Sequence, residues 1–79
     1  MNMQEKDLTE AYSLIGFDIS EAEELLQIFG NVRFVDEKIC EKLSKDNYLM
    51  KRVFAVDEDY IDVYYDRANG TITDVNILN

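Results

Sequence analysis

The sequence predicts an α+β domain in which three N-terminal helices pack on one face of a C-terminal three-stranded antiparallel β-meander. Two patterns predict this class. Apolar residues recur with helical spacing in the first half of the chain, and from Tyr48 onward they alternate with a period of two. A chain of 79 residues has room for one folded unit, so residues 1–79 are expected to form a single small acidic domain.

The first two helices are predicted from their apolar faces and their ends. The face of the first helix consists of Leu8, Ala11, Tyr12 and Ile15. Gly16 is expected to cap it in a left-handed conformation, with Phe17 folding back as the hydrophobic partner. Ser20–Glu23 reads as a capping box at the start of the second helix. The face of the second helix consists of Ala22, Leu25, Leu26 and Phe29, and Gly30 ends it.

A third helix is predicted after Asp36, whose side chain is suited to an N-cap. Its buried stripe would contain Ile39, Cys40 and Leu43, and Glu41 and Lys45 would form a surface pair one turn apart. In this prediction Cys40 is a small buried hydrophobic residue rather than a reactive thiol. The link before this helix, residues 32–35, is compatible with an extended chain.

Three strands are predicted, over Leu49–Val56, Tyr60–Asp66 and Thr71–Leu78. A three-residue loop at Ala68–Gly70, with Gly70 in the left-handed region, sets the register of the last hairpin. The facing pairs are then Arg67 with Thr71, Tyr65 with Thr73, Val63 with Val75, and Ile61 with Ile77. A three-residue loop at Asp57–Asp59 in the first hairpin would set Val53 beside Val63 and Ala55 beside Ile61.

The opposite face of this predicted sheet alternates carboxylates with tyrosines. It carries Tyr60, Asp62, Tyr64, Asp66, Ile72, Asp74 and Asn76. Tyrosine is enriched at binding surfaces, although it also favours strands that simply face solvent. The favoured partner-binding surface, called here the strand patch, is Asp57, Glu58, Asp59, Tyr60, Asp62, Tyr64, Asp66 and Asp74. A second candidate, called the helix patch, is Asp18, Glu21, Glu23 and Glu24.

Charge is unevenly distributed along the chain, whose formal net charge is −9. Acidic residues dominate residues 1–24 and 57–79, whereas bases outnumber acids six to four in residues 25–56. Solubility is one explanation. The other is that the acidic segments imitate a phosphate backbone, which carries about one charge per 1.7 Å of duplex axis. The favoured partner is then a nucleic-acid-binding protein complex with a basic surface, bound in a salt-dependent manner.

Catalysis is not expected from this composition. The chain has no His and one Cys, which excludes an internal disulfide and leaves its serines without the usual activating base. Counted from Asp57, the acidic turn has Asp62 and Ala68 at the positions where an EF-hand needs Gly and Glu, so no metal site or cofactor is predicted. We therefore predict a protein that is not an enzyme.

Direct binding to nucleic acid or to a membrane is not expected from so acidic a chain. In outline, three helices and a hairpin are similar to winged-helix DNA-binding domains. Their basic patch would be Lys38, Lys42, Lys45, Lys51 and Arg52. The acidic wing turn at Asp57–Asp59 and the long link at Gly30–Val35 argue against that comparison. The N-terminus has no signal-like apolar run, which favours a cytoplasmic location.

The small size, acidity and lack of catalytic motifs resemble the inhibitors encoded by phages and mobile elements, including anti-CRISPR and anti-restriction proteins, some of which mimic DNA. This resemblance is one of general character and implies an inhibitor that occupies a nucleic-acid-binding groove. The alternative is a structural or regulatory interaction module, with a homodimer possible. An exposed edge strand, either Leu49–Val56 or Thr71–Leu78, would then pair with its copy.

Overall fold

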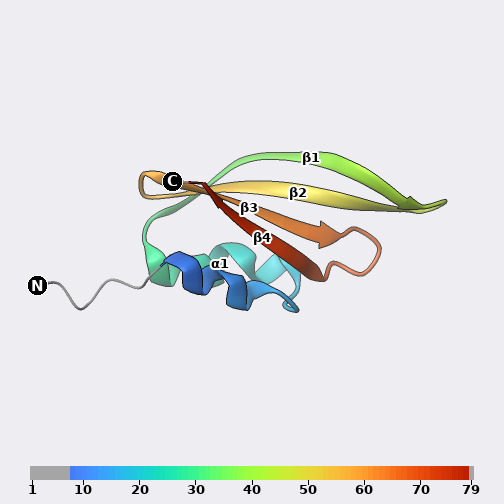
Figure 1. Ribbon diagram of the computed structural model, residues 1–79. Helices are drawn as coiled ribbons and strands as arrows, with labels where there is room; N and C mark the ends of the chain where they lie inside the picture. Colours follow the sequence, from blue (N-terminus) through green and yellow to red (C-terminus); the bar gives the residue numbers. More distant parts are fainter. Residues whose placement is uncertain (1–7, 79) are drawn as a thin grey trace, which may run out of the picture.

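A layer of short helical turns packs against one side of a four-stranded antiparallel sheet in the computed structural model, which describes residues 8–78 (Figure 1). The helical layer comprises η1 (Leu8–Leu14), η2 (Ile19–Glu21), α1 (Ala22–Leu26) and η3 (Gln27–Phe29). The strands are β1 (Val32–Ser44), β2 (Asn47–Val56), β3 (Asp59–Asp66) and β4 (Ile72–Leu78). The sheet order β1-β2-β3-β4 follows the chain, which makes it a meander. The α+β class and the meander are therefore confirmed, but three helices and three strands are not.

The first helical segment, η1, is a 3-10 helix, and this changes which side chains are buried. With about three residues per turn, every third side chain lies on one face. Ala11 and Leu14 are accordingly buried, whereas Tyr12 and Ile15 are 46% and 45% exposed. The predicted α-helical face was therefore wrong at Tyr12 and Ile15.

The second helical segment is placed as predicted, although its ends differ. Ala22 and Leu26 are fully buried, and Leu25 and Phe29 pack against the same core. The predicted capping box is replaced by Asp18, whose side chain accepts a hydrogen bond from the Ser20 N–H at 2.9 Å. Only Ala22–Leu26 is α-helical, because 3-10 turns lie on either side of it.

Gly16 and Phe17 follow the end of η1, where the sequence predicts a cap. Gly16 has φ of 101°, which confirms the left-handed position at the end of η1. The Phe17 side chain is 47% exposed and does not belong to the core cluster. The Phe17 backbone instead pairs with the start of β4, where the Ile72 N–H donates to the Phe17 carbonyl at 2.8 Å.

The predicted third helix is a strand, which is the main correction to the fold. Asp36, Ile39, Cys40 and Leu43 all lie in β1, and Cys40 is exposed rather than buried. β1 contains register shifts between Phe34 and Asp36, between Ile39 and Glu41, and between Lys42 and Ser44. Each bulge adds a residue and interrupts the period-two pattern. The apolar residues of β1 therefore recur with a spacing that imitates a helix.

The β2–β3 hairpin has a shorter connection than predicted. Val56 pairs with Asp59, which leaves Asp57 and Glu58 as the connecting residues, and Asp57 has φ of 55°. Aspartate tolerates this left-handed conformation better than most residues. A slip of one residue exchanges the two faces of a strand. Val53 and Ala55 consequently face away from the helical layer. Phe54 instead pairs with Ile61, and both belong to the core.

The β3–β4 hairpin keeps most of its predicted register. Val63 pairs with Val75 and Ile61 with Ile77, as predicted, and Gly70 has φ of 78°. An irregularity between Tyr64 and Tyr65 then pairs Tyr65 with Ile72 instead of Thr73. Near the turn the Asp66 N–H donates to the Thr71 carbonyl at 3.0 Å, so Arg67 does not face Thr71. Ile72 is 1% exposed and lies in the core rather than on the predicted outer face.

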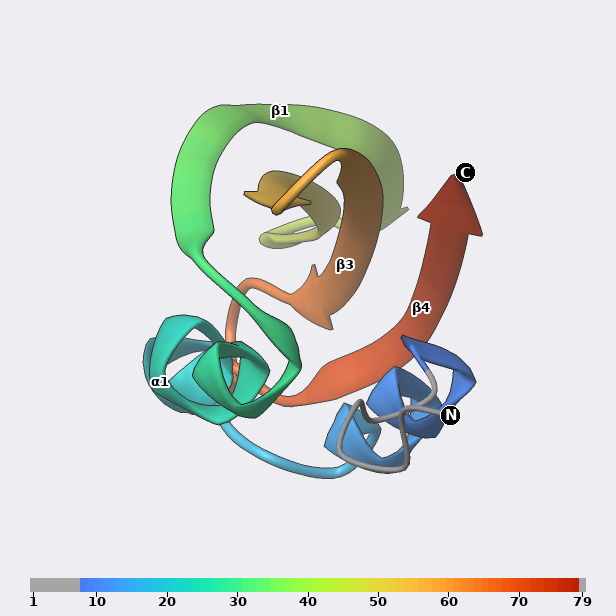
Figure 2. The ribbon, with the colours of Figure 1, turned by 90° about the vertical axis from the view of Figure 1, so that its left-hand side faces the viewer.

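The core lies between the helical layer and the near face of the sheet. Its largest fully buried side chains are Phe54, Leu26, Ile61, Ile72, Val56 and Val63. Burial of each such side chain stabilises the fold by roughly 1.5–3 kcal/mol. The sheet is strongly curved, and β1 and β2 extend beyond the turn between β3 and β4 (Figures 1 and 2). Within residues 8–78, no helix has the length and apolarity required to cross a membrane.

Candidate functional site

Asp57, the first residue of the strand patch, holds two parts of the backbone together. Its carboxylate accepts a hydrogen bond from the Asn31 N–H at 3.0 Å, and its own N–H donates to the Asn31 carbonyl at 2.9 Å. Gly30 has φ of 155°, and a Cβ there would collide with the Asp57 carboxylate. Asp57 thus joins the end of the helical layer to the β2–β3 turn, so its carboxylate has a structural partner.

Asp66 has a similar role at the other end of β3. Its carboxylate accepts hydrogen bonds from Asn47 Nδ2 at 2.7 Å, from the Ala68 N–H at 2.9 Å and from Asn69 Nδ2 at 3.0 Å. These bonds, that of Asn47 foremost, hold the pKa of Asp66 below its ordinary value of 3.8. Asp66 therefore connects the β3–β4 turn to the start of β2.

Asp62 is 5% exposed, in contrast to the prediction that it faces solvent. It lies in the middle of β3, paired with Val53 on one side and Asn76 on the other. A carboxylate this buried offers little surface to a partner. The other members of the strand patch are exposed or half-buried, although the carboxylates of Asp57 and Asp66 are bonded within the fold. The exposed members are Asp57, Glu58, Tyr60 and Asp74, and the half-buried ones are Asp59, Tyr64 and Asp66.

The strand patch also has basic neighbours on the same face of the sheet. Tyr64 pairs with Lys51 on β2 and with Asp74 on β4, and Lys51 pairs with Lys38 on β1. Burial, and then the Asp62 carboxylate, raise the pKa of Tyr64, while Lys51 opposes that shift. One row across this face thus runs from two lysines through a tyrosine to a carboxylate, and the surface is mixed in charge.

The helix patch is more uniform. All four of its members, Asp18, Glu21, Glu23 and Glu24, are exposed. Residues 8–31 contain these four and Glu10, with no Lys or Arg among them. Hydrogen bonds from Ser20 lower the pKa of Asp18, which keeps that carboxylate ionised well into the acidic range. The helical layer is therefore an acidic surface without internal neutralisation.

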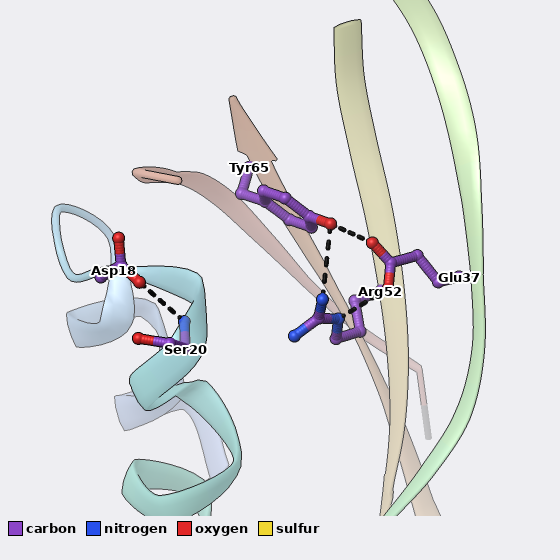
Figure 3. Close-up of polar contacts among 5 residues, drawn as sticks. All are labelled: Asp18, Ser20, Glu37, Arg52 and Tyr65. Carbon is purple, nitrogen blue, oxygen red and sulfur yellow. Dashed lines mark hydrogen bonds and ion pairs between the residues drawn. The ribbon is translucent and has the colours of Figure 1, made fainter. Parts of the chain in front are cut away.

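A cluster of Glu37, Arg52 and Tyr65, missed by the sequence analysis, links three strands (Figure 3). Arg52 Nε donates to Glu37 Oε1 at 3.0 Å, and the Tyr65 hydroxyl donates to Glu37 Oε2. The Arg52 guanidinium also lies 5.3 Å from the centre of the Tyr65 ring. The sequence did not indicate this cluster because it predicts a helix over Glu37. Glu37 lies opposite Arg52 only when β1 pairs with β2 as a strand.

The ionisation of this cluster follows from its contacts. Burial raises the pKa of Glu37, but the hydrogen bonds from Tyr65 and Arg52 outweigh it and the pKa lies below its ordinary value. Burial, and then the bond to Glu37, raise the pKa of Tyr65. Glu37 is therefore a stable carboxylate and Tyr65 a stable phenol. Such a pair is suited to fastening strands together.

The carboxylates of the described residues do not gather into a metal site. Within residues 8–78, no group of three or more His, Cys, Asp or Glu side chains is arranged to hold a metal ion. Comparisons with protein-family models, with curated proteins and with solved structures each found no match to this chain. The exposed surfaces of the described residues are therefore the features that bear on function.

Proposed function

We propose that this chain is a non-catalytic acidic protein that acts by docking its helical layer onto a basic surface of a protein partner. The observation that carries the proposal is the charge of residues 8–31, which include five carboxylates and no base. Exposed apolar side chains lie in the same layer, namely Tyr12, Ile15, Phe17 and Ile28. Apolar contacts surrounded by like charges suit a surface that binds an oppositely charged protein.

The favoured partner is a nucleic-acid-binding complex, because its groove is built to receive closely spaced negative charge. The chain would then act as phage-type or mobile-element-type inhibitors of restriction or CRISPR systems act, by occupying the groove in place of nucleic acid. The helix patch is favoured over the strand patch, since Asp57 and Asp66 are held in turns and Asp62 is buried. A winged-helix domain requires a third helix, whereas residues 36–44 of this chain belong to strand β1.

The test uses two variants with the same change in charge. The first replaces Glu21, Glu23 and Glu24 with Gln, which neutralises most of the helix patch and keeps helix propensity. The matched control replaces Glu58 with Gln, and Asp46 and Asp74 with Asn, three exposed positions outside the helical layer. Tagged full-length proteins are used to capture partners from a host lysate at low salt, and the retained proteins are challenged with rising salt and with duplex DNA.

We expect the unmodified chain and the control to retain a nucleic-acid-binding complex that both salt and duplex DNA release. The helix-patch variant should lose it. Retention that is insensitive to salt and DNA would contradict mimicry of nucleic acid. Equal loss in both triple variants would show that bulk charge, rather than the helix patch, governs binding.

A further inference from the structure

β1 is an edge strand whose outer side has no backbone partner within residues 8–78 (Figure 1). Leu49–Val56, one of the two edge strands that the sequence predicts, lies in β2, which is paired on both sides. β4 is the other edge, and its first residues are covered by the chain around Gly16–Ile19. β1, with 13 residues, is therefore the longer free pairing edge of the described sheet, since β4 has 7 residues and its start is covered.

Four large apolar side chains of β1 are exposed. Phe34 is 54% exposed, Val35 42%, Ile39 55% and Leu43 47%. An exposed edge strand of this kind is a template for pairing with another strand. Its charged residues and bulges restrict that pairing to partners that match them. The charges of β1 therefore limit which strands can pair with it.

We propose that β1 pairs antiparallel with β1 of a second copy, across a two-fold axis that lies between Ile39 and Cys40. In this register Lys38 lies opposite Glu41 of the second copy, and Glu37 lies opposite Lys42. The two-fold axis repeats both pairs, so four cross-strand pairs of opposite charge form. The neighbouring registers that also match faces are less favourable. An axis between Lys38 and Ile39 would set Asp36 opposite Glu41, and an axis between Cys40 and Glu41 would set Ile39 opposite Lys42. Charge thus favours the register with four pairs of opposite charge.

The bulge at Cys40 makes this register possible. A two-fold axis perpendicular to the sheet requires facing residues to lie on the same face of their strands. Lys38 and Glu41 pair with Lys51 and Leu49, which lie two residues apart on β2 and hence share a face. Glu37 and Lys42 pair with Arg52 and Tyr48, which share the opposite face. Without the bulge, positions 38 and 41 would point to opposite faces and could not meet in this way.

This dimer does not rest on the proposed function, because it uses the sheet edge and leaves the helix patch free. The test is sedimentation equilibrium of the full chain over a range of concentrations, at about 0.15 M salt to screen the net charge of each copy. We expect a concentration-dependent monomer–dimer equilibrium. Lys38→Glu sets a second carboxylate opposite Glu41 at both repeats of the pair, and Glu41→Lys sets a second ammonium group opposite Lys38 at both. Each substitution should weaken the dimer roughly tenfold.

Recombining the two changes gives a sharper readout than either alone. The double variant K38E/E41K restores opposite charges and should dimerise like the unmodified chain. An equimolar mixture of the two single variants, one carrying a larger tag, should form the heterodimer in preference to either homodimer. Lys45→Glu is the matched control, since it changes net charge equally but lies opposite Phe34 in this register, and it should leave the dimer unchanged.

Circular dichroism of each variant verifies that the sheet is intact. A chain that stays monomeric at every concentration overturns the proposal. So does a dimer that Lys38→Glu leaves unchanged, or a double variant that fails to recover association, since both would place the contact elsewhere.

Discussion

The Tyr65 side chain on β3 contacts residues of both β1 and β2. It donates to Glu37 on β1, while Arg52 on β2 donates to Glu37 and lies over the Tyr65 ring. Tyr65 itself is 6% exposed, so water cannot readily replace a lost partner. The cluster therefore fastens β1 and β2 to β3 beside the hydrophobic core.

Replacing Tyr65 with Phe removes the hydroxyl and keeps the ring. We expect a loss of about 1 kcal/mol in the free energy of unfolding, because Glu37 loses a hydrogen-bond donor in a half-buried position. The melting temperature should fall by roughly 4–8 °C in a domain of this size. Tyr60→Phe is the control, since Tyr60 is 46% exposed, and thermal unfolding of both variants is the measurement. Equal shifts in the two variants would show that the cluster contributes nothing beyond packing.

The pH dependence of stability also belongs to single residues. The pKa of Asp66 is lowered in the folded protein from 3.8, so protons bind the unfolded state more tightly. Its stabilising contribution is present above that value and is lost as the pH falls through the lower folded value. We expect the free energy of unfolding to decrease on acidification below about pH 4.

The variant Asp66→Asn should show a shallower decrease over the same acidic range, because position 66 no longer titrates. Glu58→Gln, at an exposed turn position, should follow the unmodified chain. Urea unfolding at several pH values measures the difference. Identical slopes for Asp66→Asn and the unmodified chain would assign the acid sensitivity to other carboxylates.

Among the elements, the junction between η3 and β1 is fixed by a close approach. Gly30 lies against the Asp57 carboxylate with no space for a Cβ, and its φ of 155° disfavours other residues. Gly30→Ala should therefore force Asp57 away from Asn31 and loosen the helical layer from the β2–β3 turn. Gly16→Ala is the matched control, because Gly16 has φ of 101° but nothing within 4 Å of the added Cβ.

We expect Gly30→Ala to lower the free energy of unfolding by at least about 1 kcal/mol more than Gly16→Ala does. Chemical denaturation of the two variants measures this difference directly. If both alanine variants lose the same amount, the cost is backbone conformation alone, and the contact between Gly30 and Asp57 adds nothing.

The elements also show what the sequence could predict. Alternation of Ile61, Val63, Val75 and Ile77 was sufficient to pair β3 with β4. The predicted core face of β2 was wrong because the β2–β3 turn is one residue shorter than predicted. This difference places Phe54, rather than Val53, on the core face. The prediction of a helix in place of β1 was wrong because the bulges of β1 give Ile39, Cys40 and Leu43 a helix-like spacing. Turn length and bulges depend on tertiary contacts, such as that of Asp57 with Asn31, which local pattern does not contain.

The candidate site could be predicted only as a charge pattern. The acidity of the helix patch is visible in the sequence, and its exposure follows from a short helix packed on one side. The burial of Asp62 and the turn contacts of Asp57 and Asp66 are not visible there, since they depend on strand register and on the approach of Asn31 and Asn47.

In the whole molecule, charge is separated in space. Residues 32–56, which form β1 and β2, contain six bases and four acids, whereas residues 8–31 and 57–78 contain one base and eleven acids. The long axis of 51 Å, against 20 and 16 Å for the others, reflects the extension of the β1–β2 hairpin. The acidic helical layer and the mixed-charge edge are thus separate surfaces, and each can be altered without changing the other.

The order of the strands has a consequence for how the chain acquires its structure. Every strand of the meander pairs with its neighbour along the chain, so the sheet can grow hairpin by hairpin with short loops to close. The helical layer, made first during synthesis, must wait for partners made last, since Gly16 and Ile19 bond to Ile72 and Gly70. Until β4 emerges from the ribosome, Ala11 and Leu14 lack the surface that buries them.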